Sequence, residues 1–262
     1  MSRWWSMVRK EWLGLRWIML LAAGAIAALD IFLAYKVSSR AMNMIGYNMA
    51  IGLSTIPFAG LFIASLVAGY LSMRNEWQHN TSVRLLSYPV SGASLISAKL
   101  ATTVFSLTVL AVWAGLGTLL VATRTPNLVV DILRADWVFS TYKAWEIWAG
   151  IAVFIIVTIA LLTFINAVGM FSFVVGTLVP RVSGLLSVVV YCLVTWVSGA
   201  FAPLAMYLAS FVPNLKVIAY GHDVLESVVR VALPALPLWP LVAGSVVLVL
   251  CAGRMLDREV DA

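Results

Sequence analysis

Charged residues are scarce in this chain. Asp, Glu, Lys and Arg account for 11% of its 262 residues, whereas hydrophobic residues account for 63%. A soluble domain carries about 25% charged residues, because water must solvate its surface, so an ordinary soluble domain is excluded. The mean hydropathy is +1.01, and a chain of this length can hold roughly six spans of about 20 residues with their loops. The composition therefore predicts a polytopic membrane protein whose residues 1–262 form a single transmembrane domain.

Residue types that catalyse reactions or bind metals are also few. The chain has two cysteines, Cys192 and Cys251, and two histidines, His79 and His222. Both cysteines lie in apolar runs, without the spacing of a metal site or of a disulfide framework. The sequence contains no Gly-rich phosphate loop, no H-E-x-x-H and no G-x-S-x-G. We therefore expect no catalytic residue, no metal and no cofactor on this chain.

Long apolar runs dominate what the sequence does contain, and their length indicates membrane-spanning helices. They cover roughly residues 17–35, 45–72, 100–122, 146–178, 183–212 and 236–253. The fourth run is longer than one upright span needs, so we expect it to tilt or to project beyond the bilayer. The fifth run contains Pro203 and ends at Pro213, which favours a break or a re-entrant piece there. The predicted fold class is an all-α membrane protein with six spans.

The first residues, MSRWWSMVRKEWLGLRW, predict an amphipathic helix over residues 1–16 before the first span. Trp4, Trp5 and Trp12 fall near one face at helical spacing, and the charged residues lie largely elsewhere. Such a helix lies in the membrane interface with its tryptophans at headgroup depth. A cleaved signal peptide has a shorter apolar core and a small-residue cleavage site, so we expect an uncleaved first span.

The distribution of Lys and Arg predicts the orientation of the chain. With both termini inside, ten of the 17 basic residues fall in inside segments and seven in outside segments. Cytoplasmic segments normally carry the excess, so we expect a multi-pass protein of the cell (plasma) membrane with both termini in the cytoplasm. The net charge of +6 is scattered near span ends without a basic patch. It therefore indicates contact with the lipid bilayer and not with nucleic acid.

Two polar residues within the predicted spans are candidates for a functional role. Asp30 lies late in the first run, and an intramembrane carboxylate is by default a candidate functional residue. Its position near a span end also allows it to reach the outer interface, close to Lys36 or Arg40. Asn166 lies in the middle of the fourth run, where a hydrogen bond to a neighbouring helix is a commoner role than substrate binding. We expect that Asp30 and Asn166 either line the transport pathway or pack between helices.

One long polar segment, residues 73–99, separates the second run from the third and reads MRNEWQHNTSVRLLSYPVSGASLISAK. It predicts a short helix that ends before Pro89, because the residue before a proline disfavours the helical conformation. The residues that can cap this helix are Asn80, Thr81 and Ser82, and those that can cap the next helix are Ser91 and Ser94. The short helix would expose Leu85 and Leu86, which favours either a docking partner or a helix folded back onto the membrane surface.

The same segment resembles the loop between spans two and three of ABC-2 type permeases, the transmembrane subunits of ATP-binding cassette exporters. The residues that match the family pattern are Glu76, Thr81, Leu85, Leu86, Pro89, Val90, Ser91, Lys99 and Leu100. Asn80 stands where the family has glycine, a departure that a helix-cap position tolerates. The N-terminal MVRKEWLGLRW and the C-terminal CAGRMLDREVDA are similar to the family's interfacial helix and to its basic-then-Asp tail.

This resemblance implies that residues 81–91 form a cytoplasmic coupling helix that docks on a separate P-loop ATP-binding subunit, present in two copies. The contact residues would be Thr81, Arg84, Leu85, Leu86, Pro89 and Val90. Arg181, in the short VPRVSG loop on the same side, is either a second contact with that subunit or a positive-inside anchor. The resemblance further implies that ATP and Mg bind to the partner and that a second permease chain completes a homodimer or heterodimer. Residues 213–235 resemble the family's extracytoplasmic gate region.

The resemblance implies that the chain functions in export, and the small number of charges in the spans favours an amphipathic or hydrophobic cargo, such as a peptide, an antibiotic or a lipid. Alternative functions stay open. An ATP-independent secondary transporter or channel would need charges or broken helices near the membrane midplane, for which Asp30 is the candidate. An integral-membrane enzyme would need a cluster of polar catalytic groups. A permease used for sensing or immunity would bind its ligand without net transport.

Overall fold

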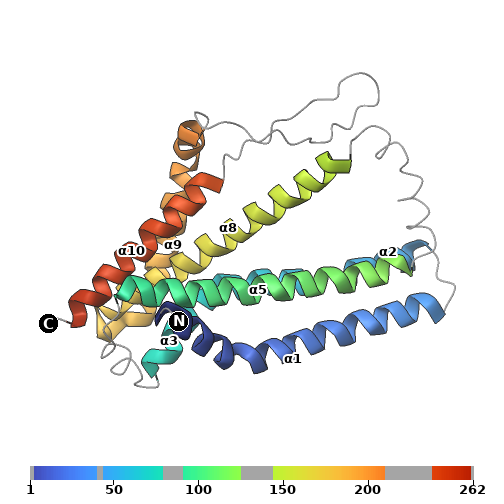
Figure 1. Ribbon diagram of the computed structural model, residues 1–262, viewed down its shortest axis with the longest axis horizontal. Coiled ribbons are helices and arrows are strands. Elements are labelled where there is room, and N and C mark those ends of the chain that lie inside the picture. The colour runs from blue at the N-terminus through green and yellow to red at the C-terminus, as the bar shows by residue number, and fades with distance from the viewer. Residues whose placement is uncertain (1–2, 40–43, 79–90, 125–143, 210–237, 261–262) are drawn as a thin grey trace. The chain divides into compact units, whose positions relative to one another are not determined.

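The computed structural model describes residues 3–39, 44–78, 91–124, 144–209 and 238–260, and every regular element among them is a helix (Figure 1). The helices are α1 (Arg3–Ser39), α2 (Met44–Ser54), α3 (Ile56–Gln78), α5 (Gly92–Thr123), α8 (Ala144–Thr177), the 3-10 turn η1 (Pro180–Val182), α9 (Ser183–Ala209) and α10 (Leu238–Val260). Six candidate membrane spans lie in these residues: Trp4–Ser38, Ile45–Asn75, Gly92–Thr123, Ile155–Thr177, Ser183–Leu204 and Leu238–Asp257. The predicted all-α class with six spans is therefore confirmed.

Two helices are more continuous than the sequence pattern predicts. Residues 3–16 form the first turns of α1, which runs without interruption to Ser39. Their placement in the membrane interface stays a prediction. The fifth run also continues as helix through Pro203 to Ala209, so the break expected at Pro203 does not occur. Membrane helices tolerate an internal proline where other groups satisfy the freed backbone carbonyl; Pro213 lies outside the described residues.

The second run is broken instead, at Thr55 between α2 and α3. Pro57 follows in the first turn of α3 and has no N–H for a helical bond four residues back, so one bond of the regular ladder is missing there. The backbone makes tighter turns here: the Thr55 N–H donates to the Gly52 carbonyl at 3.2 Å, and the Phe58 N–H donates to the Thr55 carbonyl at 3.0 Å. The two helices together still form one candidate span, Ile45–Asn75.

The chain divides into two compact units. The first contains Met1–Leu66 and Thr102–Thr141, and the second contains Val67–Ala101 and Tyr142–Ala262. Helices α3 and α5 therefore contribute one part to each unit. The single transmembrane domain over residues 1–262 stays a prediction.

In the first unit, the part of α5 from Thr102 onward packs against α1 and α2. A buried cluster joins the three helices and consists of Leu33, Val37, Ala50 and Val121. Two side chains of α5 reinforce this packing by donating to backbone carbonyls. The Trp113 indole N–H donates to the Ala23 carbonyl at 3.1 Å, and the Thr118 hydroxyl donates to the Ser54 carbonyl at 3.0 Å.

In the second unit, α8 packs against both α9 and α10 (Figure 1), and small residues allow α3 to cross α8 closely. A Cβ added at Gly69 would overlap the backbone of Asn166, and one added at Gly169 would lie 2.9 Å from the Tyr70 nitrogen. Membrane helices commonly associate through such small residues, because lipid tails remove the hydrophobic drive between helices. Large apolar side chains such as Trp196 are exposed by 73%, which fits contact with lipid.

Candidate functional site

The predicted docking helix lies outside the described residues. All of its proposed contact residues, Thr81, Arg84, Leu85, Leu86, Pro89 and Val90, fall within residues 79–90. The structure does describe both flanks of this segment, since α3 ends at Gln78 and α5 begins at Gly92. Both flanks belong to the second unit. The candidate site is therefore built from the groups that hold these flanks.

The start of α5 is fixed by Ser91 and by a carboxylate from the other end of the sequence. The Ser91 carbonyl accepts hydrogen bonds from the Ser94 N–H at 2.9 Å and from the Leu95 N–H at 3.2 Å. Ser91, one of the two predicted cap positions, therefore directly precedes the helix. The Gly92 N–H donates to Oδ1 of Asp257 in α10 at 2.7 Å. A carboxylate at this position satisfies an N–H that has no partner within the helix and interacts favourably with the helix dipole.

Two glycines allow α5 and α10 to approach at this point. A Cβ added at Gly92 would lie 2.6 Å from the Gly253 carbonyl oxygen, and one added at Gly253 would overlap the backbone of Ala93. Leu256, one turn later in α10, is 1% exposed. Sequence reasoning missed this contact. The available signal was the spacing of four residues between Gly253 and Asp257, which places them on one face of a helix.

A buried lysine joins the same part of α5 to α3. Lys99 is 2% exposed, and its ammonium group donates to the Ser72 carbonyl at 3.5 Å. The helix does run through Lys99 into the third span, as predicted. Burying an ammonium group is costly unless polar groups surround it, so this contact holds the first turns of α5 against the last turns of α3. Both helices that flank residues 79–90 are thereby joined to each other.

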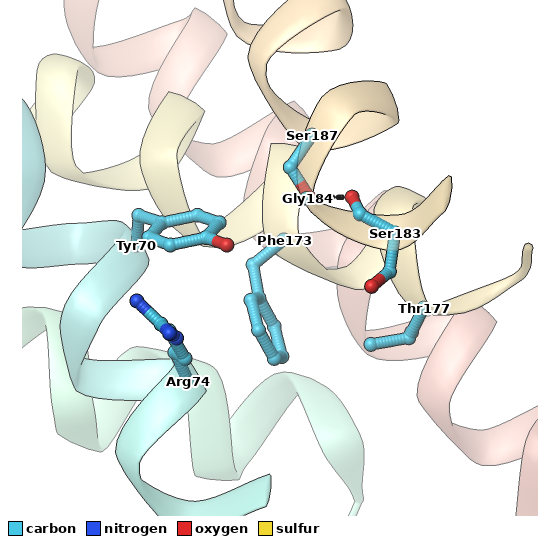
Figure 2. Close-up of a pocket in the computed structure, with 7 residues that line it drawn as sticks. All are labelled: Tyr70, Arg74, Phe173, Thr177, Ser183, Gly184 and Ser187. Atoms are coloured by element: carbon cyan, nitrogen blue, oxygen red, sulfur yellow. Dashed lines mark hydrogen bonds between the residues drawn. The ribbon is translucent and has the colours of Figure 1, made fainter. Parts of the chain in front are cut away.

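A cavity of about 480 Å³ opens beside these flanks, between α3, α8 and α9. Its described lining residues are Tyr70, Arg74, Phe173, Thr177, Ser183, Gly184 and Ser187. Figure 2 shows Tyr70 and Arg74 on one side of this α3–α8–α9 cavity and Thr177 and Ser183 on the other, with Phe173 between them. The rings of Tyr70 and Phe173 meet edge to face, with their centroids 5.4 Å apart. The cavity therefore combines one cation and several hydroxyl groups with an aromatic wall.

Arg181 lies in η1, the turn between α8 and α9, and its side chain is exposed. The turn is held closely because Gly176 of α8 lies against Ser187 of α9, where a Cβ on Gly176 would overlap the Ser187 hydroxyl. The Ser187 hydroxyl donates in turn to the Ser183 carbonyl at 2.8 Å (Figure 2). This geometry presents Arg181 at the end of two spans, and its contact with an ATP-binding subunit stays a prediction.

Asp30 is more deeply buried than its position near a span end suggests. It is 2% exposed, and it packs on Gly117 of α5, where a Cβ would overlap the carboxylate. Neither carboxylate oxygen has a hydrogen-bond partner among the described residues. The expected approach to Lys36 is not observed: the Lys36 ammonium lies 5.5 Å from the Phe32 ring centroid. Six residues correspond to about 240° around a helix, so Asp30 and Lys36 point to different faces; Arg40 lies outside the described residues.

Asn166 is fully buried where α8 crosses α3. Its amide N–H donates to the Leu162 carbonyl of its own helix at 2.8 Å, in place of the expected bond to a neighbouring helix. Its amide oxygen has no hydrogen-bond partner among the described residues. The backbone of Asn166 contacts Gly69, so Asn166 contributes to helix packing. Its role in a transport pathway stays a prediction.

Comparison with protein families gives a match over a large part of the chain. The model of the ABC-2 family transporter protein matches residues 13–184, a range that contains both flanks of the polar segment, the segment itself and the turn with Arg181. Comparisons with curated proteins and with solved structures gave no match. The match covers well over half of the chain, and the six candidate spans agree with it. The chain therefore belongs to the ABC-2 family of transporter proteins and is a multi-pass membrane permease, a transport component that is not itself catalytic.

Proposed function

We propose that this chain is the permease subunit of an ABC-type exporter and that residues 81–91 dock on a separate ATP-binding subunit. The family match over residues 13–184 carries the proposal. Membership of the family implies association with an ATP-binding subunit and with a second permease chain. In the assembly we propose, two ATP-binding subunits bind ATP and Mg at the cytoplasmic face, and two permease chains form the pathway as a homodimer or heterodimer. Both termini face the cytoplasm of a plasma-membrane protein.

The contacts at the flanks of residues 79–90 support the transmission of movement from this segment to the membrane-spanning helices. Pulling on the segment displaces the first turn of α5, because the chain enters that helix at Gly92. Asp257 and Gly253 hold this turn against α10, and Lys99, about two turns later, holds α5 against α3. In the proposed mechanism, closure of the ATP-binding subunits therefore moves α3, α5 and α10 together at their ends.

The small number of buried charges supports an amphipathic or hydrophobic cargo. Among the described residues, the buried charged side chains are Asp30 and Lys99. A bare ion would need several polar groups at one depth, because the bilayer interior solvates charge poorly. We therefore propose a peptide, an antibiotic or a lipid as the exported cargo.

Co-purification tests the docking proposal. The full-length chain carries a C-terminal tag and is extracted in mild detergent, and the proteins that remain bound are identified and quantified. We expect a P-loop ATPase at near-equal amount in the wild type, and its loss in Leu86→Asp, because a carboxylate cannot enter an apolar groove without a large desolvation penalty. Asn75→Asp, which adds the same charge at an exposed position of α3, should retain the ATPase.

Two results would contradict the proposal. The first is the absence of any ATPase from the wild type under several extraction conditions. The second is equal retention by Leu86→Asp and Asn75→Asp. Either result would favour an ATP-independent secondary transporter or channel. The observation that supports this alternative is the buried carboxylate of Asp30.

A further inference from the structure

We propose that the α3–α8–α9 cavity binds the phosphate of an anionic phospholipid headgroup. The inference goes beyond docking and export, because it concerns a lipid of the surrounding membrane, and it does not depend on the ATP-binding subunit.

The cavity lies at the depth of lipid headgroups. Three candidate spans end at its walls: the second span ends at Asn75, directly after Arg74, the fourth ends at Thr177, and the fifth begins at Ser183. Span ends mark the boundary between the hydrocarbon core and the polar headgroup layer. A ligand in this cavity is therefore placed where the phosphates of the bilayer lie.

The polar groups of the cavity match a phosphate. Arg74 supplies a planar guanidinium that binds phosphate oxygens through two parallel hydrogen bonds. None of the described lining residues is acidic. The hydroxyls of Tyr70 and Ser183 donate no hydrogen bond to any described residue, which leaves both as donors. The hydroxyl protons of Thr177 and Ser187 are already donated to helix carbonyls, at 2.7 Å and 2.8 Å.

The apolar groups beside the cavity fit the rest of a lipid. Phe173 and Tyr70 form an aromatic wall within it (Figure 2). Large apolar side chains close in sequence to the lining residues Thr177 and Ser183 are exposed, and they include Leu178, Val179, Val182 and Leu185. Acyl chains of a headgroup-bound lipid would lie against them. The volume of about 480 Å³ lies within the range of about 300–1,000 Å³ that is usual for small-ligand sites.

The combination favours a membrane lipid over a soluble anion. A soluble phosphate would use the cation and the hydroxyls but would gain nothing from the exposed apolar surface. Basic pockets between membrane helices on the cytoplasmic side bind anionic headgroups, and the predicted orientation places Arg74 on that side. We therefore assign the cavity to a lipid with a net negative headgroup.

Native mass spectrometry of the full-length chain in detergent tests this assignment. Phosphatidylglycerol is titrated against phosphatidylcholine, which carries a phosphate but no net charge. We expect preferential retention of phosphatidylglycerol, and a loss of affinity of at least about tenfold in Arg74→Ala, because one charge-assisted hydrogen bond is worth about tenfold and the guanidinium would make two. Arg74→Lys keeps the charge without the planar fork and should give an intermediate affinity. Arg254→Ala removes an equal charge from an exposed position of α10 outside the cavity and should change nothing.

Each of the following four outcomes would overturn the assignment. Unchanged phosphatidylglycerol affinity in Arg74→Ala and Arg74→Lys removes Arg74 from the site. Equal losses in Arg74→Ala and Arg254→Ala show that the lipid responds to surface charge alone. Complete displacement of the lipid by excess inorganic phosphate assigns the cavity to a soluble anion. Loss of a bound ATP-binding subunit from Arg74→Ala, with lipid affinity unchanged, assigns Arg74 to protein docking.

Discussion

Replacing Gly253 with alanine is expected to separate α10 from the first turn of α5. The added Cβ would overlap the backbone of Ala93 and lie 2.7 Å from the Ala93 side chain. Carbon atoms pack at about 3.5–4.0 Å, so the two helices must move apart by about 1 Å. The bond from the Gly92 N–H to Oδ1 of Asp257, at 2.7 Å, then exceeds the usual limit of about 3.2 Å.

The expected loss of stability follows from these two effects. Overpacking a tight contact costs about 1–3 kcal/mol, and losing a hydrogen bond to a charged group costs about 1.5–3 kcal/mol. Because Asp257 is partly exposed, solvent screens its charge, and losing this hydrogen bond costs an amount near the lower end of that second range. The higher helix propensity of alanine compared with glycine offsets about 0.5–1 kcal/mol of this destabilisation. The net destabilisation is roughly 2–4 kcal/mol.

Thermal unfolding in detergent, followed by the fluorescence of the 11 tryptophans, measures this loss. Gly24→Ala is the matched control, because the same substitution in α1 meets no atom within 4 Å and should be neutral or stabilising. The double variant Gly253→Ala/Asp257→Ala should lose less than the sum of the single losses, since both changes disrupt one contact. Equal melting temperatures for Gly253→Ala and Gly24→Ala would refute the proposed packing.

Substitutions at three further positions probe the other buried contacts. Gly69→Ala places a Cβ on the Asn166 backbone and should destabilise by about 1–3 kcal/mol in the same melting assay; an unchanged melting temperature would contradict the close crossing of α3 and α8. Lys99→Ala should destabilise by about 2–4 kcal/mol and Lys99→Met by less, because methionine fills the buried volume, and equal losses would show that the charge alone matters. Asp30→Asn should preserve ATP-dependent transport in reconstituted vesicles; its complete loss, with normal folding, would show that the Asp30 carboxylate takes part in transport.

The sequence was sufficient to predict which segments cross the membrane. Each span is a long apolar run, and hydrophobicity over about 20 residues is a local property. The start of α5 at Ser91 was also predictable, because a serine followed by an apolar run is a local capping signal. The break at Thr55 has a local cause in Pro57, yet the predicted break lay at Pro203. A proline limits backbone conformation at both positions, and its surroundings decide whether the helix continues.

The contacts between spans were not predictable in the same way. Gly92 and Asp257 are hydrogen-bonded although they are 165 residues apart, and no local pattern connects them. The place of Asp30 late in the first apolar run predicts a position close to the outer interface. Its burial, however, depends on Gly117 of a different helix. In a membrane, lipid-facing and protein-facing surfaces are both apolar, so hydrophobic periodicity does not identify the packed face of a span. The α3–α8–α9 cavity likewise requires three helices that the sequence separates.

The contact between Gly92 and Asp257 also permits docking and transmission to be separated. Leu86 lies in the proposed docking helix, so Leu86→Asp should remove the ATP-binding subunit. Asp257 holds the turn that follows the helix, so Asp257→Ala should leave the subunit bound and reduce only the transport obtained per ATP hydrolysed. Asp257→Asn keeps an acceptor oxygen for the Gly92 N–H and should lose less coupling than Asp257→Ala. Co-purification measures binding, and cargo uptake with ATP hydrolysis in inverted vesicles measures coupling. If Asp257→Ala lost the subunit as completely as Leu86→Asp, the contact would serve docking, because it would position residues 81–91 for binding without transmitting their movement to α10.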